Sequence, residues 1–288
     1  AALILSVIIN FFVGFSTGVS AITAAAFGSF HYKKLSQVLH MVITLSLILG
    51  TIMTAVGILF SGSFLRWINC PDQVLAPAKT YLNICMLGII PQFLYNMGNA
   101  LLRSLGNTKE PLYFLTLSSV MNLVLDVLFV VGAGTGLAGA GAATVISQWF
   151  LALLMVRKMT RLDDAYRLRF SGLLKGWNQL FEIVRTGLPS GMQAVFMSIS
   201  SIVIQYSINA FGADAAAGMV VFARVEGFLY YPSFAYGMAL TGFIGQNYGA
   251  GRMDRVEEGM KKSILTLTTF TVAAGLLLMA AAPTVLKL

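Results

Sequence analysis

The apolar residues of this chain fall into long runs that are separated by short polar segments. The runs do not alternate polar with apolar positions, so the pattern predicts helices rather than the strands of a membrane barrel. Each run is near or above the roughly 20 residues that a helix needs to cross a bilayer. The approximate ranges are 1–27, 37–61, 77–102, 111–133, 137–156, 183–211, 215–248 and 263–282. The sequence therefore predicts an all-α, polytopic membrane protein with about eight spans in a transmembrane helix bundle.

Composition also indicates that most of the chain lies in a lipid bilayer. Hydrophobic residues make up 57% of the 288 positions, charged residues only 10%, and the mean hydropathy is +0.81. The net charge of +8 comes from basic residues in the loops, so it predicts an orientation and does not indicate nucleic-acid binding. Fifteen of the nineteen basic residues fall in alternate loops, beginning after the first span, and by the positive-inside rule these loops are cytoplasmic. The predicted location is the plasma membrane, with both chain ends outside.

The long polar connection between the fifth run and the sixth predicts a division into two lobes. Its apolar residues are spaced as on a helix, so residues 161–182 are predicted to form a basic amphipathic helix along the cytoplasmic interface. An offset of 221 overlays Phe27-Gly28 on Tyr248-Gly249 and Lys34 on Arg255, which suggests an internal repeat. We therefore expect two pseudo-symmetric lobes, 1–160 without its first helix and 183–288 without its last ones.

One carboxylate lies in the middle of an apolar run. Asp126 is the only charged residue between Glu110 and Arg157, and a charge at the centre of a membrane helix costs about 2.5–3.5 kcal/mol. Such a residue indicates a functional site, although a structural acid that pairs with Arg103 or Arg224 is the alternative.

Other polar residues form stripes that can meet Asp126. Ser119 and Asn122 share its helix face, Thr144 and Gln148 form a second stripe, and Gln92, Asn96, Asn99 and Arg103 form a third. The depths of Asp126 and Thr144 agree, whereas Asn96 needs helix tilt or a kink at Pro91 to join them. Carboxylate, amide and hydroxyl oxygens suit a small hard cation, and a desolvated Asp also takes up a proton. Interhelical hydrogen bonding is the plainer explanation for Gln92, Asn99 and Gln148.

The second lobe contains a further polar set. Arg224 and Glu226 are two residues apart and therefore do not face each other on a helix. Ser198, Ser201, Gln205 and Asn209 share one face of the preceding run. Together they indicate a second-lobe cavity, with structural pairing of Arg224 and Glu226 as the alternative.

Motifs of catalysis are missing from the sequence. His31 and His40 flank a predicted cytoplasmic turn without the spacing of a metal site, and we expect them to be solvated or interfacial. Gly134, Gly136 and Gly139 spell G-x-G-x-x-G, but they join two membrane spans and follow no strand. No Walker A sequence is present. The protein is not expected to be an enzyme or to need a resident cofactor.

Four segments resemble the multidrug and toxic compound extrusion transporters, a family within the multidrug/oligosaccharidyl-lipid/polysaccharide exporter group. They are Arg103-Ser-Leu-Gly-Asn-Thr-Lys-Glu-Pro111, Asn122-Leu-Val-Leu-Asp126, Gly187-Leu-Pro189 and Gly245-Gln-Asn-Tyr-Gly-Ala-Gly251. With the order of the spans, the resemblance covers nearly the whole chain, which is similar to helices two to nine of the family's twelve.

The resemblance implies a secondary active antiporter that exchanges Na⁺ or H⁺ for organic, often cationic, compounds by alternating access. It assigns the coupling-cation site to Asn122, Asp126, Thr144 and Asn96, with Na⁺ at the first three as one form of that site. A lipid-linked oligosaccharide flippase of the same superfamily is the alternative, but basic residues are scarce within the spans. An intramembrane enzyme would need a second catalytic group near Asp126. The expected partners are drugs or organic cations and the lipid bilayer, without nucleic acid or an obligatory protein partner.

Overall fold

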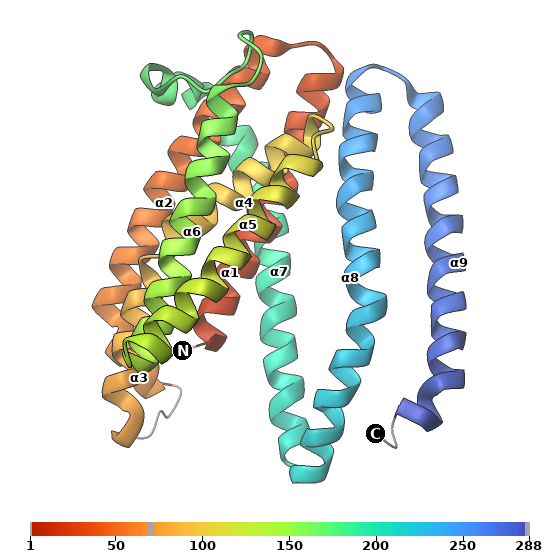
Figure 1. Cartoon of the computed structure of the whole chain (residues 1–288). Helices are drawn as coiled ribbons and strands as arrows, with labels where there is room; N and C mark the ends of the chain where they lie inside the picture. Colours follow the sequence, from red (N-terminus) through yellow and green to blue (C-terminus); the bar gives the residue numbers. More distant parts are fainter. Residues whose placement is uncertain (1, 68–71, 286–288) are drawn as a thin grey trace.

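The computed structural model describes residues 2–67 and 72–285, and all of the regular secondary structure in this part of the chain is helical (Figure 1). The side chains of a few of these residues, Asn209 among them, lie outside the description. The helices are α1 (Ala2–Gly28), α2 (Tyr32–Trp67), α3 (Asp72–Met86), α4 (Ile89–Ser104), α5 (Lys109–Asp126), the π-helix η1 (Val127–Gly132), α6 (Gly136–Thr160), the 3-10 helix η2 (Phe170–Gln179), α7 (Leu180–Asn209), α8 (Ala213–Gly249) and α9 (Met253–Val285).

The predicted all-α membrane fold is confirmed. Within the described ranges, six helical stretches are long and apolar enough to cross a membrane, and α3 with α4 forms a seventh if this bent pair is one span. The predicted span 215–248 corresponds to α8, which has ample length at 37 residues but is less apolar than the others. Arg224 and Glu226 lie in its first half.

The third predicted span is broken rather than continuous. The axes of α3 and α4 differ by 41°, and the break lies at Leu87 and Gly88, not at Pro91 itself. Pro91 has no N–H to bond the carbonyl of Leu87, so the continuous helix is interrupted one turn before the proline. Pro91 then occupies the first turn of α4, where no intrahelical donor is required.

The core lies among α1, α2, α4 and α6. Phe12 of α1 stacks on Phe93 of α4 with ring centroids 3.9 Å apart, and both side chains are buried. Leu39 of α2, Met97 of α4 and Met155 of α6 belong to the same buried cluster. This apolar core fixes the helices that carry the polar stripes.

The inter-lobe connection differs from the predicted amphipathic α-helix. Residues 161–169 are irregular, and the helix that follows is the 3-10 helix η2. Its two buried glycines, Gly172 and Gly176, leave no room for a Cβ against α2, so close contact decides the local conformation. The predicted apolar residues divide into two sets. Leu162, Leu173 and Leu180 pack on the core, whereas Phe170, Leu174, Trp177 and Phe181 are exposed.

Two turns of the chain repeat each other at the offset of 221. Helix α1 ends at Gly28 and α2 begins at Tyr32, while α8 ends at Gly249 and α9 begins at Met253. The residues with positive φ, Phe30 at 57° and Gly251 at 70°, are related by the same offset. Identical geometry at matched positions is the expected signature of a structural repeat. The lobe boundaries themselves stay a prediction.

These repeated helices also contact each other symmetrically. A Cβ on Gly28 would meet the carbonyl oxygen of Gln246, and a Cβ on Gly249 would meet the carbonyl oxygen of Ala25. The offset of 221 converts each of these contacts into the other. Helices α1 and α8 therefore cross at a local pseudo-two-fold axis, with glycines where the backbones touch.

The crossing lies at one end of the molecule. In Figure 1, α1 and α8 come together near the α1–α2 and α8–α9 turns, and the α7–α8 hairpin spreads away from the first six helices at the opposite end. Ser104 of α4 joins the closed end, because Gln246 Nε2 donates to its carbonyl oxygen at 2.6 Å. The bundle is thus tightly closed at one end and open at the other.

Candidate functional site

Asp126 occupies the last position of α5, where the α-helix becomes the π-helix η1. The wider turn is marked by the hydrogen bond from Ala133 N to Leu128 O at 2.9 Å. π-Helical turns are rare and are frequently found at functional sites, because they re-aim the side chains around them. Asp126 Oδ1 and Asn122 Nδ2 are both buried atoms, and neither has a hydrogen-bond partner in the described structure.

A small cavity lies between α1, α3, α4 and α6. Its volume is about 130 Å³, and Thr144, Gln148 and Gln92 line it together with Tyr81 and Cys85. Tyr81 and Cys85 are within hydrogen-bonding reach of each other, and Tyr81 is close enough to Asp126 to interact with it electrostatically. The cavity thus brings Gln92 of the α4 stripe together with Thr144 and Gln148 of the α6 stripe, whereas Asp126 and Asn122 are not among its lining residues.

The four predicted cation ligands are not equally placed. Asn122 and Asp126 share one face of α5, and Thr144 lies on α6, which packs against α5. Asn96 is buried on α4, where its Nδ2 donates to Gln92 O at 2.9 Å. Helix α4 reaches α5 mainly through α6, so Asn96 is the least directly connected of the four.

The oxygen atoms of Asp126 and Thr144 suit a small cation or a proton. Asp126 offers a carboxylate oxygen without a partner, and Thr144 Oγ1 donates its proton to Ala140 O at 2.9 Å, which leaves its lone pairs free. Oxygen atoms of this kind are ligands for hard cations, and the lone carboxylate also accepts a proton. The residues present therefore fit either ion.

The structural alternative for Asp126 finds no support in the described residues. Arg103 Nη1 contacts the sulfur of Met238 at 3.2 Å, and its Nε has no partner. Arg224 is exposed on α8. Neither arginine forms an ion pair with Asp126, whose Oδ1 remains unpaired.

A larger polar cavity lies between α1, α7 and α8, with a volume of about 780 Å³. The predicted residues Glu226 and Gln205 line it, as do Ser198 and Ser201, whereas Arg224 does not. The side chain of Asn209 lies outside the described residues. Asn10 of α1 also contributes, and its Nδ2 donates to Ser198 Oγ across the cavity at 2.9 Å.

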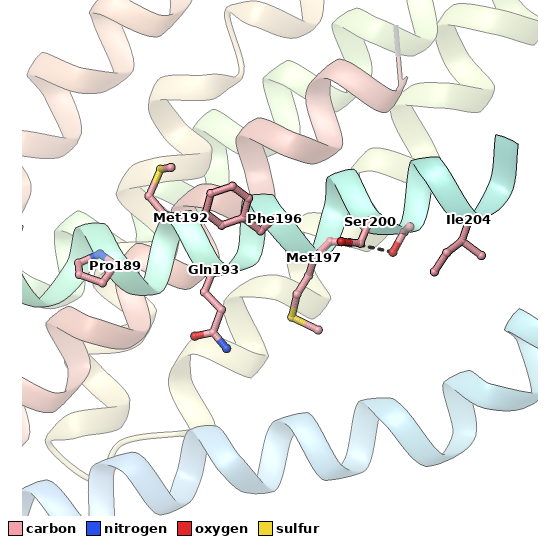
Figure 2. A pocket seen from close by; sticks show the side chains of 8 residues that line it. Pro189, Met192, Gln193, Phe196, Met197, Ser200 and Ile204 are labelled. Atoms are coloured by element: carbon pink, nitrogen blue, oxygen red, sulfur yellow. Dashed lines mark hydrogen bonds between the residues drawn. The ribbon is translucent and has the colours of Figure 1, made fainter. Parts of the chain in front are cut away.

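A neighbouring hollow of about 700 Å³ follows the exposed face of α7. Figure 2 shows Gln193 and Met197 pointing toward α8, with Met192 and Phe196 on the other side of the helix. Gln193, Met197 and Ser201 line both spaces. Methionine and aromatic side chains give adaptable apolar contacts next to the polar cavity.

Sequence reasoning missed several residues that these cavities contain. Tyr81, Cys85 and Gly88 precede the predicted stripe residue Gln92 at helical spacing, so extending that stripe toward the start of the third span would have found them. Asn10 is the only amide side chain in the first predicted span and gave no pattern. His40 was expected to be solvated or interfacial, but it is only 5% exposed. That expectation is wrong because residues 168–179 fold back over the ring.

Comparison with known proteins identifies the family. The MatE family model matches residues 1–128 and 189–288, which together are most of the chain. Among curated proteins, the chain is 26% identical over 264 residues to the "Probable multidrug resistance protein YoeA" of Bacillus subtilis, covering 89% of this chain and 57% of that protein. It is 26% identical over 267 residues to the "FAD transporter" of Shewanella oneidensis, covering 90% and 58%. The chain thus spans just over half the length of these relatives.

Solved structures share the fold. One described as MATE in the bent conformation has a TM-score of 0.91 at 24% identity, covering 98% of this chain and 63% of that one. A second, an outward-facing multidrug resistance MATE family transporter of the MOP superfamily, has a TM-score of 0.89 at the same identity and coverage. The match to the family model over most of its length shows that this chain is a multi-pass membrane protein that belongs to the MatE family, the multidrug and toxic compound extrusion transporters.

Proposed function

We propose that the chain is the ion-coupling part of a secondary active antiporter that exchanges Na⁺ or H⁺ for organic, often cationic, compounds. The observation that carries the proposal is Asp126, a carboxylate within a membrane span whose buried Oδ1 has no partner among the described residues. An unpaired buried acid is costly, and it is relieved by binding a proton or a small cation. The names of the curated multidrug resistance relatives support the assignment of cargo.

Coupling requires that the ion bias two arrangements of the helices. We infer that occupancy of Asp126 acts through the α-to-π transition that begins at the next residue, because a π-turn can convert to α-helix with a shift of the chain that follows. Asn122 and Thr144 complete the site in the Na⁺ form. Asn96 contributes to the site indirectly, because α4 contacts α5 mainly through α6.

Alternating access is supported by the crossing of α1 and α8. The contacts at Gly28, Gly249 and Gln246 close one end of the bundle, and the cavity that contains Glu226 lies between the same helices. If the basic loops are cytoplasmic, as the positive-inside rule predicts, the closed end is the cytoplasmic one. The described arrangement then corresponds to an outward-open state in the plasma membrane.

We assign the organic cargo to the cavity between α1, α7 and α8. Glu226 provides a negative charge there, and Tyr230, Tyr231 and Phe234 provide aromatic faces that attract an organic cation. The flippase alternative is less well supported, because no Lys or Arg is among the residues that line this cavity. A pyrophosphate-linked substrate would need such cations.

The test is transport of a fluorescent organic cation by the intact protein in vesicles, with sodium and pH gradients imposed separately. We expect one of the two gradients to drive transport and Asp126→Asn to abolish the coupling while the protein still inserts normally. Asp164→Asn, which neutralises an exposed acid of the connecting segment, is the matched control and should transport normally. Uptake driven by ATP alone, or undiminished uphill transport by Asp126→Asn, would contradict the proposal.

A further inference from the structure

His40 is a buried imidazole that the proposed transport mechanism does not use. It lies near the start of α2, is only 5% exposed, and is covered by residues 168–179, which we call the strap. The strap is the connection between α6 and α7. A Cβ on Gly172 would lie 2.9 Å from the His40 ring, so the strap packs directly on the imidazole.

The two ring nitrogens of His40 have partners of opposite kind. Nδ1 lies 2.7 Å from Ser36 O, a carbonyl that only accepts, so Nδ1 carries the proton. Nε2 lies 3.0 Å from the backbone nitrogen of Arg169, which only donates, so Nε2 accepts. The neutral imidazole with its proton on Nδ1 satisfies both bonds.

Other residues of the same α2 face hold the strap in register. Thr44 Oγ1 donates to Leu173 O at 2.6 Å, and Gln179 Nε2 donates to Gln37 Oε1 at 3.3 Å. One turn further on, Lys34 pairs with Glu182 at 2.8 Å. The strap and the start of α7 thus run antiparallel to α2, and His40 lies at the centre of the polar contacts.

We propose that His40 is a pH-sensitive clasp, which holds the strap against α2 while its imidazole is neutral and releases the strap when the imidazole gains a proton. The conformational switch rests on the contacts above. Its consequence for transport rests on the proposed function, because the strap joins the two predicted lobes and its release frees the start of α7 to move.

Protonation breaks the arrangement for two reasons. Both nitrogens of an imidazolium are donors, so Nε2–H would face the N–H of Arg169. The new charge would also be buried without a described carboxylate against the ring. The charged groups on the packed elements are paired elsewhere or exposed: Lys34 with Glu182, Arg167 with Asp164, and the exposed Arg169, Lys175 and Arg185.

The clasp is expected to release the strap at low pH. Histidine changes charge between roughly pH 5 and 8, which includes physiological and acidified cytoplasm. The clasp is closed at the alkaline end of that interval, where Nε2 accepts, and opens as the pH falls. In the proposed orientation the strap faces the cytoplasm, so the device responds to cytoplasmic acidification.

Hydrogen–deuterium exchange on the intact protein in lipid nanodiscs tests the clasp without a transport assay. Protection of the backbone amides of residues 168–176, corrected for intrinsic exchange rates, should fall about five- to tenfold between pH 7.5 and 5.5. His40→Gln should remove this pH dependence, because the glutamine amide can accept from Arg169 N at both pH values. His31→Gln changes the exposed histidine of the adjacent α1–α2 turn and should behave as the parent protein does.

Two outcomes would overturn the clasp: equal strap protection at both pH values in the parent protein, or unchanged pH dependence in His40→Gln. Thr44→Val provides a second measurement if His40→Gln does not fold. It removes the bond to Leu173 O and should lower protection equally at both pH values while the pH dependence remains. Failure of transport with an intact pH response would count against the proposed function alone.

Discussion

Single residues decide which ion the site can take. Asp126 provides the charge, and the neutral oxygens of Asn122 and Thr144 distinguish a sodium site from a proton site, because a proton needs one acceptor and Na⁺ needs several oxygen ligands. Thr144 is the informative position, since it lines the small cavity between α1, α3, α4 and α6 while its hydroxyl donates to its own helix.

Thr144→Val separates the two kinds of coupling. The valine keeps the volume and removes the oxygen, so sodium-driven transport should need about a tenfold higher Na⁺ concentration for half-maximal rate, in line with the loss of roughly 1–2 kcal/mol for one polar contact. Proton-driven transport should keep its rate. The measurement is initial uptake against sodium concentration in vesicles of the intact protein, with Thr116→Val, the same change on the exposed part of α5, as the control. An unchanged sodium dependence in a sodium-driven transporter would remove Thr144 from the site.

At the scale of helices, the sequence predicted which segments are helical better than it predicted where those helices bend or change their winding. The apolar runs predicted every described membrane helix, because twenty apolar residues have no stable alternative to a helix in a bilayer. The break between α3 and α4, the π-helix after Asp126 and the 3-10 conformation of η2 were not predicted. Each of these depends on contacts from other elements, such as those between Gly176 and α2, which no local pattern contains.

The α1–α8 crossing leads to a prediction at the same scale. Gly249→Leu should prevent closure of this end, because its Cβ would meet the carbonyl oxygen of Ala25. Spin labels near the α1–α2 and α8–α9 turns of the intact protein should then report a longer distance, and gradient-driven transport should fall at least about tenfold. Tyr248→Leu places the same side chain one position away on an exposed face and should leave both measurements unchanged. A normal distance in Gly249→Leu would mean that the crossing does not control closure.

For the whole molecule, the prediction concerns orientation. The strap and the α1–α2 and α8–α9 turns lie at the end that the basic residues assign to the cytoplasm, and the start of α6 lies toward the other end. Gly134 belongs to the short connection between η1 and α6. In a background with Cys70 and Cys85 replaced by Ser, a membrane-impermeant thiol reagent should label Gly134→Cys in intact cells. Asp163→Cys, in the connecting segment, should react only after the membrane is opened. The reverse pattern would invert the assignment.

The sequence by itself determined the helical membrane fold, the position of Asp126 on its helix face and the repeat at offset 221. These properties depend on hydrophobicity and on residue spacing, and both are local. Tertiary structure alone decided that Tyr81 and Cys85 join Thr144 at one cavity, that Glu226 rather than Arg224 lines the second cavity, and that His40 is buried beneath the strap. The direction of a side chain follows from its helix, but what it meets depends on how neighbouring helices pack, and glycine contacts between distant segments fix that packing.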